Sequence, residues 1–263
     1  MPPTTPQPQG AARLPDTGSP ATALRLDVVS DVICPWCHIG RARLARALGK
    51  LSSGGIAVQV TWRPFELNPD MPPEGMSRRD YRTRKFGSWE RSRMLDEQVV
   101  REGRAEGLEF AYDRVSRTPS TRRAHRLVHR AHREGGAELQ DQLVGRLFSA
   151  YFDTGEDVGE PDTLVGIARA CGMNAAGLGD YLRSTEDEDI VVGQEMLAVR
   201  AGVQGVPSVL HGDLVLFSGA LPADDIVGLI QVTLERRPCP DTTTPGTSAQ
   251  PVGGADRSIF DSA

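Results

Sequence analysis

Two cysteines separated by two residues form the part of this sequence best suited to chemistry: Cys34-Pro35-Trp36-Cys37. A pair at this spacing can exchange disulfides, supply half of a zinc site, or form an inert bridge. A zinc site needs two further ligands at suitable spacing, and the other two cysteines, Cys171 and Cys239, each stand alone. We therefore favour redox chemistry and expect no metal.

The neighbouring elements place this pair where a strand leads into a helix. Residues 24–29 predict a strand, and the segment from Cys37 onward has apolar residues at helical spacing. Cys34 then lies at the helix N-terminus, where unpaired N–H groups and the positive end of the dipole favour a thiolate. We expect a lowered pKa for Cys34, and a drop of roughly two units corresponds to about 2.7 kcal/mol. Pro35 suits the first turn because its missing N–H costs nothing there.

The same spacing assigns a different role to each sulfur. Cys37 shares a helix face with Leu44, Leu48 and Leu51, so it should point inward. Cys34 should lie at an exposed lip one turn earlier. We predict that Cys34 attacks a partner disulfide and that Cys37 resolves the mixed disulfide.

Composition excludes several other classes of protein. The chain has 263 residues, 39% of them hydrophobic and 25% charged, with a net charge of −5. This balance is ordinary for a globular protein and gives no reason to expect nucleic acid or membrane partners. We see no secretory leader and no apolar stretch of spanning length. We expect a cytoplasmic protein, where structural disulfides are rare.

The pattern along the chain predicts an α/β fold in five sections. Residues 1–23 and 238–263 are rich in Pro, Thr, Gly and Ser and are expected to be disordered tails. A first sheet section covers 24–70, with its second strand at 56–62. Section 71–201 is expected to be all helical, and 202–237 returns to the sheet. Because strands must pair with one another, the helical section is expected to be an insertion into one sheet domain.

Several local patterns support this division. An apolar stripe predicts a helix over 138–152, and Pro161 opens the next helix. Residues 185–188 fit a capping box that starts a further helix. Near the C-terminal end, Gly212-Asp213 predicts a hairpin turn, and 222–236 predicts a last amphipathic helix.

Longer stretches carry a family resemblance. They are Ser30 to Cys37 with Ile39-Gly40, residues 63–69, residues 124–127, residues 147–155, and Gly202 to Pro207. Together they resemble the DsbA-like branch of the thioredoxin fold and, within it, the FrnE-like dithiol–disulfide oxidoreductases. The resemblance implies a thioredoxin-like fold with a large all-helical insertion domain.

The resemblance also implies a cis peptide at Val206-Pro207 that faces the two cysteines. Proline makes the cis form accessible at about 0.5–1 kcal/mol, although a trans turn remains an alternative. The backbone of Val206 would then be free to pair with an extended substrate segment. The expected substrate-binding residues are Pro35, Trp36, His38, Val206 and Pro207, and the expected cleft-lining residues are Phe65, Asn68 and His125.

Other side chains have less specific interpretations. His38 stands where relatives usually carry tyrosine; it either tunes Cys34 or merely lines the helix surface. Cys171 is expected to pack in the core as a small hydrophobe. Cys239 has no nearby partner, which leaves exchange with Cys34 or an intermolecular bridge as alternatives. His125 begins a histidine stripe, but neighbouring arginines argue against a metal there.

The favoured function is a thiol–disulfide oxidoreductase or isomerase acting on disulfide-containing proteins or small thiols. Its redox cofactor is the Cys34–Cys37 pair itself, with glutathione or another small thiol as an open alternative. The main rival is a thiol-dependent isomerase or transferase of the kappa-class glutathione transferase or 2-hydroxychromene-2-carboxylate isomerase type, acting on aromatic polyketide intermediates. Such relatives usually replace a motif cysteine, so two cysteines favour redox chemistry. A third interpretation is a binding protein without catalysis. Redox direction, substrate and homodimer formation stay open.

Overall fold

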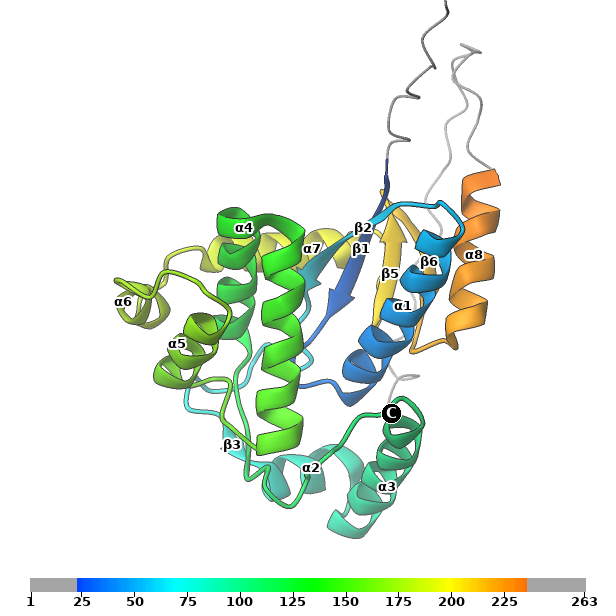
Figure 1. The fold of residues 1–263 in the computed structure, drawn as a ribbon. Coiled ribbons are helices and arrows are strands. Elements are labelled where there is room, and N and C mark those ends of the chain that lie inside the picture. The colour runs from blue at the N-terminus through cyan, green and yellow to red at the C-terminus, as the bar shows by residue number, and fades with distance from the viewer. Residues whose placement is uncertain (1–22, 236–263) are drawn as a thin grey trace, which may run out of the picture.

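The computed structural model describes residues 23–235 (Figure 1). Both predicted tails, apart from Ala23, lie outside the described residues, as does Cys239.

A four-stranded sheet in the order β2-β1-β5-β6 carries the site. Its strands are β1 (Leu24–Ser30), β2 (Val58–Pro64), β5 (Ser208–His211) and β6 (Leu214–Ser218). Strand β1 pairs in parallel with β2 and antiparallel with β5, and β5 and β6 form the predicted hairpin. The parallel pair needs a crossover, which α1 (Pro35–Ser53) provides. The expected α/β architecture is confirmed.

Helix α1 and the last helix, α8 (Ala223–Glu235), lie side by side along the sheet (Figure 1). Their apolar faces meet alternate residues of β1, because successive strand side chains point to opposite faces. Leu26 and Val28 share one buried cluster with Leu44 of α1 and Ile226 of α8. Val29 points to the other face, where it packs with Ala198 of α7 (Glu188–Arg200).

The section between β2 and β5 contains most of the helices. They are α2 (Arg78–Phe86), α3 (Trp89–Ala105), α4 (Arg122–Ser149), α5 (Pro161–Ala170), α6 (Leu178–Arg183) and α7 (Glu188–Arg200). The helical insertion expected from the sequence is confirmed, although the section is not entirely helical. Strands β3 (Met76–Ser77) and β4 (Arg117–Thr118) pair antiparallel, and Ala150–Thr154 forms a π-helical turn, η1. Two-residue strands are too short to leave a periodic pattern in the sequence.

Two predicted helix boundaries also change. The helix predicted over 138–152 corresponds to the second part of α4 together with the first residues of η1. Helix α4 begins much earlier, at Arg122, and has a kink at Gly135 and Gly136. The predicted capping box at 185–188 is wrong, because Asp187 is the N-cap of α7 and its side chain makes no capping bond. Instead, its carboxylate accepts hydrogen bonds from Tyr181 at 3.1 Å and Arg133 at 3.3 Å.

Helix α4 attaches the insertion to the edge of the sheet. The Gln140 side chain accepts a hydrogen bond from the Trp62 backbone N–H at 2.9 Å and donates one to its carbonyl at 3.0 Å. The next residue, Asp141, accepts from the Trp62 indole at 3.0 Å and from Arg41 of α1 at 2.6 Å. Apolar residues of sheet and insertion form one buried cluster. The sheet sections and the helical insertion are therefore separate in sequence but share one hydrophobic core.

No helix among residues 23–235 is both long and apolar enough to cross a bilayer.

Candidate active site

The CPWC segment forms the first turn of α1, as the sequence predicts. Cys34 is the N-cap, with extended backbone angles, and Pro35 opens the helix. The Cys34 N–H donates to the Asp31 carbonyl at 3.0 Å, and the Cys34 carbonyl accepts from the Cys37 N–H at 3.1 Å. Hydrogen bonds to the preceding and the following residues therefore fix this turn, and the Cys34 sulfur lies at the positive end of the helix.

The two sulfurs differ less in exposure than the sequence predicts. Cys37 is 0% exposed, so its inward orientation is confirmed. Cys34 is only 5% exposed, and the prediction of an exposed lip is wrong. The reason is the loop before β5, since the Cys34 thiol lies 3.8 Å from the Val206 carbonyl and donates to it. Pro35 and Trp36 are the half-buried, more accessible part of the motif.

Burial sets the protonation of the inner sulfur. It raises the pKa of the Cys37 thiol well above its ordinary value, and the hydrogen bond and charge of Cys34 raise it further. The Ser30 hydroxyl and the backbone of Asp31 act in the opposite direction and lower that pKa by less. Both motif cysteines are free thiols in this structure. Cys37 is thus a protonated thiol directly behind Cys34.

The Val206-Pro207 peptide is cis, as the resemblance implies. Its loop is held by the Ser208 hydroxyl, which donates to the Gly205 carbonyl at 2.7 Å, and by Gly219, whose N–H donates to the Pro207 carbonyl at 2.8 Å. Pro207 and Cys37 line the same small void beneath the motif. Within residues 23–235 the Val206 N–H has no hydrogen-bond partner, which leaves it available to an incoming backbone.

His38 lies inside an aromatic cluster, so the interpretation that it lines the helix surface is wrong. It is 5% exposed and stacks on Phe148 at 5.0 Å and on Phe152 at 5.7 Å between ring centroids. Burial, helped by the charge of Arg41, lowers the pKa of His38 to about 4. Neither ring nitrogen has a hydrogen-bond partner among the described residues. The alternative role, tuning Cys34, stays a prediction.

The three expected cleft-lining residues lie in different surroundings. Phe65 is half-buried and, like Val206, packs against the small apolar cluster on the α7 side of the sheet. Asn68 accepts a hydrogen bond from the Tyr81 hydroxyl at 2.7 Å, while its amide nitrogen is buried without a partner in the described chain. His125 is 3% exposed and faces Asp31, with its Nε2 3.4 Å from Asp31 Oδ1.

Sequence reasoning missed Asp31 as a residue of this site. Its carboxylate is 0% exposed, and Oδ2 accepts a hydrogen bond from the Leu67 N–H at 2.8 Å. An acidic residue three positions before Cys34, set within the apolar run around it, was the signal that could have identified it.

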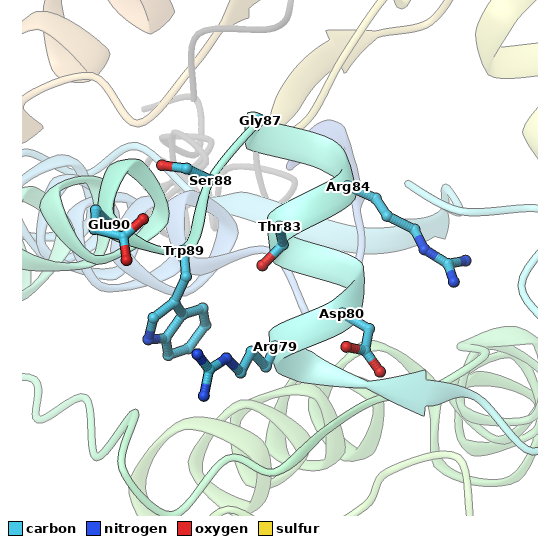
Figure 2. A pocket seen from close by; sticks show the side chains of 8 residues that line it. All are labelled: Arg79, Asp80, Thr83, Arg84, Gly87, Ser88, Trp89 and Glu90. Atoms are coloured by element: carbon cyan, nitrogen blue, oxygen red, sulfur yellow. The ribbon is translucent and has the colours of Figure 1, made fainter.

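A surface hollow between α2 and α3 lies apart from the motif (Figure 2). The Arg79 side chain extends along the Trp89 ring, with its guanidinium carbon 5.8 Å from the ring centroid, while Arg84 and Asp80 point to the opposite side of α2. No motif or cis-proline residue lines this hollow. Among residues 23–235, no cluster of three or more His, Cys, Asp or Glu side chains has a geometry suited to a metal ion.

The geometry of the motif agrees with a comparison against known families. A family model described as a DSBA-like thioredoxin domain matches residues 25–231. The chain belongs to this DsbA-like family. The match includes the helical insertion, so the DsbA-like domain covers nearly all of the described chain, and the thioredoxin-like fold expected from the sequence is confirmed.

One curated protein and two solved structures illustrate what this DsbA-like chain is similar to. It is 27% identical over 195 residues to the uncharacterized protein YwbO of Bacillus subtilis (strain 168), covering 73% of this chain and 89% of the relative. A crystal structure of a probable DsbA oxidoreductase from Streptomyces coelicolor is 27% identical, with a TM-score of 0.73 and coverage of 88% and 98%. The cytosolic disulfide reductase DsbM from Pseudomonas aeruginosa, solved with GSH, is 20% identical, with a TM-score of 0.55 and coverage of 81% and 100%. The last match shows likeness of fold.

Proposed function

We propose that this DsbA-like protein is a thiol–disulfide oxidoreductase in which Cys34 attacks and Cys37 resolves. The observation that carries the proposal is the position of Cys34 as helix N-cap, with a buried thiol behind it and a cis Val206-Pro207 peptide in front. A helix N-terminus favours the thiolate that exchange requires.

In the reductive direction, the Cys34 thiolate attacks one sulfur of a substrate disulfide. A Cys34–substrate disulfide forms, and the other substrate sulfur leaves as a thiolate that takes up a proton. Cys37 then loses its proton and attacks the Cys34 sulfur, which releases the second substrate thiol. The substrate gains two electrons, and the protein is left with a Cys34–Cys37 disulfide. The reverse sequence donates that disulfide, and the reduction potential decides the direction.

A substrate would be held by its backbone. The Val206 N–H, which has no partner within residues 23–235, can pair with an extended segment, and half-buried Phe65 and Trp36 can contact the apolar side chains of that segment. Because the Val206 carbonyl covers Cys34, an approaching disulfide has to displace the contact between the thiol and that carbonyl. We propose protein disulfides or small-thiol disulfides as substrates, with a thiol such as glutathione as the electron donor and no cofactor beyond the cysteine pair.

An insulin-reduction assay and a scrambled-disulfide assay on wild type, Cys34→Ser and Cys37→Ser test this proposal. We expect Cys34→Ser to lose activity at least a hundredfold, because the nucleophile is removed. Cys37→Ser should accumulate a mixed disulfide at Cys34, visible by mass spectrometry. Cys171→Ala is the matched control, because Cys171 is buried in the insertion core and takes no part in the exchange.

Equal activity of all these proteins would contradict the proposal. If wild type instead isomerises a 2-hydroxychromene-2-carboxylate or conjugates glutathione, and Cys37→Ser does so equally well, the transferase or isomerase function replaces it.

A further inference from the structure

A buried group of charges lies behind the CPWC turn, and the exchange steps above make no use of it. Asp31, Glu66 and His125 are 0%, 3% and 3% exposed. Arg122 and Glu195 are their charged neighbours. These residues come from the β1–α1 turn, the segment after β2, the first turn of α4, and α7.

The contacts divide this group into two connected halves. In the first half, Asp31 Oδ1 lies 3.4 Å from Nε2 of His125, and Oδ2 accepts from the Leu67 N–H at 2.8 Å. In the second half, Glu66 accepts a hydrogen bond from Arg122, while the Glu66 N–H donates to Glu195 at 3.2 Å. The segment at 66–67 belongs to both halves.

The group therefore contains three carboxylates and one guanidinium, and that guanidinium is bound to Glu66. Within the described chain, His125 is the one basic side chain within ion-pair distance of the Asp31 carboxylate, which otherwise accepts hydrogen bonds from backbone N–H groups. A buried charge without a partner is costly, so this arrangement favours a protonated imidazole. Burial alone would lower the pKa of His125, but the nearby charge of Asp31, 3.4 Å away, and the charges of Glu66 and Glu195 raise that pKa above its ordinary value.

Asp31 also connects the group to the reactive sulfur. Its backbone carbonyl accepts the Cys34 N–H at 3.0 Å, so the residue that bears the buried carboxylate is part of the Cys34 turn. A negative charge at this position opposes formation of a thiolate, unless an adjacent positive charge balances it.

We propose that His125 is a positioning residue that keeps a proton on Nε2 beside Asp31 and thereby prevents the Asp31 charge from opposing the Cys34 thiolate. The inference rests on the proposed function, since it concerns the nucleophile of that exchange. Loss of the proton from His125 leaves Asp31 uncompensated and makes Cys34 less reactive.

Alkylation of Cys34 tests this proposal without substrate turnover. The parent protein carries Cys37→Ser, Cys171→Ala and Cys239→Ala, so that Cys34 is its single thiol. We expect His125→Gln to slow iodoacetamide modification about tenfold at pH 7, equivalent to about one unit in the pH profile. The two profiles should converge at high pH, where the thiol is ionised in both proteins.

A double variant separates charge from structure. Asp31→Asn with His125→Gln removes both charges, and we expect its alkylation rate to return to within about threefold of the parent. The proposal is overturned if His125→Gln follows the parent profile, or if the double variant is as slow as His125→Gln alone.

A second measurement keeps the proposal testable if His125→Gln fails to fold. Nitrogen-15 NMR of the histidine side chains in the wild-type protein reports protonation directly. We expect the His125 ring to be protonated at pH 7, and His38 to serve as the neutral reference, since its pKa is about 4. A neutral His125 at pH 7 would overturn the proposal. If instead Cys34→Ser retains insulin reduction, the proposed function fails. The alkylation and NMR measurements would still report the effect of His125 on Cys34, because neither depends on substrate turnover.

Discussion

His38 shows how a single ionisable residue can be held neutral beside a redox motif. Its ring is stacked among Phe148, Phe152 and Phe110, and neither ring nitrogen has a partner in the described chain. From the sequence it was expected to contact substrate, and either to tune Cys34 or to line the helix surface. The rings that bury it come from residues more than 70 positions later, so local periodicity could not predict its surroundings.

The low pKa of His38 predicts a dependence of stability on pH. The folded pKa of about 4 lies below the value near 6.5 in the unfolded chain, so the unfolded state binds more protons between these values. Stability should therefore fall as the pH drops through this window. At pH 5 the loss relative to pH 7 is about 2 kcal/mol.

His38→Phe should remove this loss, because phenylalanine carries no proton and preserves the stacking. Urea unfolding of both proteins at pH 7 and pH 5 measures the difference. The raised pKa of His125 acts in the opposite sense, because it stabilises the fold at low pH and that contribution is lost as the pH rises. That contribution is common to both proteins and cancels in the comparison. Identical pH dependence of the two proteins would contradict this account of His38.

At the scale of elements, the approach of helix α1 to the cis-proline loop depends on Gly40. A Cβ atom added at Gly40 would lie 3.0 Å from Pro207 Cγ, which is tighter than ordinary van der Waals contact. The glycine therefore allows the loop to approach Cys34, whose thiol contacts the Val206 carbonyl. The sequence predicted the helix and the loop correctly, but the distance between them is a property of their packing.

Gly40→Val should displace the Pro207 loop and lower insulin reduction at least tenfold, because the substrate backbone loses its alignment with Cys34. Alkylation of Cys34 should persist, since the nucleophile remains. Gly49→Val is the matched control on the same helix, because a Cβ there meets no atom within 4 Å. Similar insulin reduction by both variants would show that the close approach of Gly40 to Pro207 is unimportant.

At the scale of the whole molecule, the insertion and the sheet form one structure. Gln140 of α4 satisfies both backbone groups of Trp62 on the edge strand β2, in the way that a neighbouring strand would. This contact covers a strand edge that would otherwise present unpaired N–H and carbonyl groups. The proposed exchange site therefore depends on a fold to which both sections contribute.

Gln140→Leu should destabilise the protein by about 2–4 kcal/mol, because it leaves a buried N–H and a buried carbonyl of Trp62 unpaired. Gln142→Leu, on the exposed side of the same helix, should change stability by less than about 0.5 kcal/mol. Urea denaturation of both variants gives the comparison. A small effect at Gln140 would mean that water satisfies the Trp62 backbone and that the insertion is less tightly joined.

The sequence by itself determined the features that depend on neighbouring residues. These are the strand before Cys34, the helix after it, the inward orientation of Cys37 and the hairpin near Gly212. Each follows from local spacing, which constrains backbone and side-chain direction within a few turns.

Only the tertiary structure decided the features that join distant parts of the chain. Cys34 is covered by Val206, which is 172 positions away, and His125 meets Asp31 across the insertion. These contacts change exposure and charge, which are set by whatever packs against a residue rather than by its neighbours in sequence. For that reason the sequence could identify the reactive sulfur. The contact of Val206 with Cys34 and the buried charges near the motif could be recognised only in the folded chain.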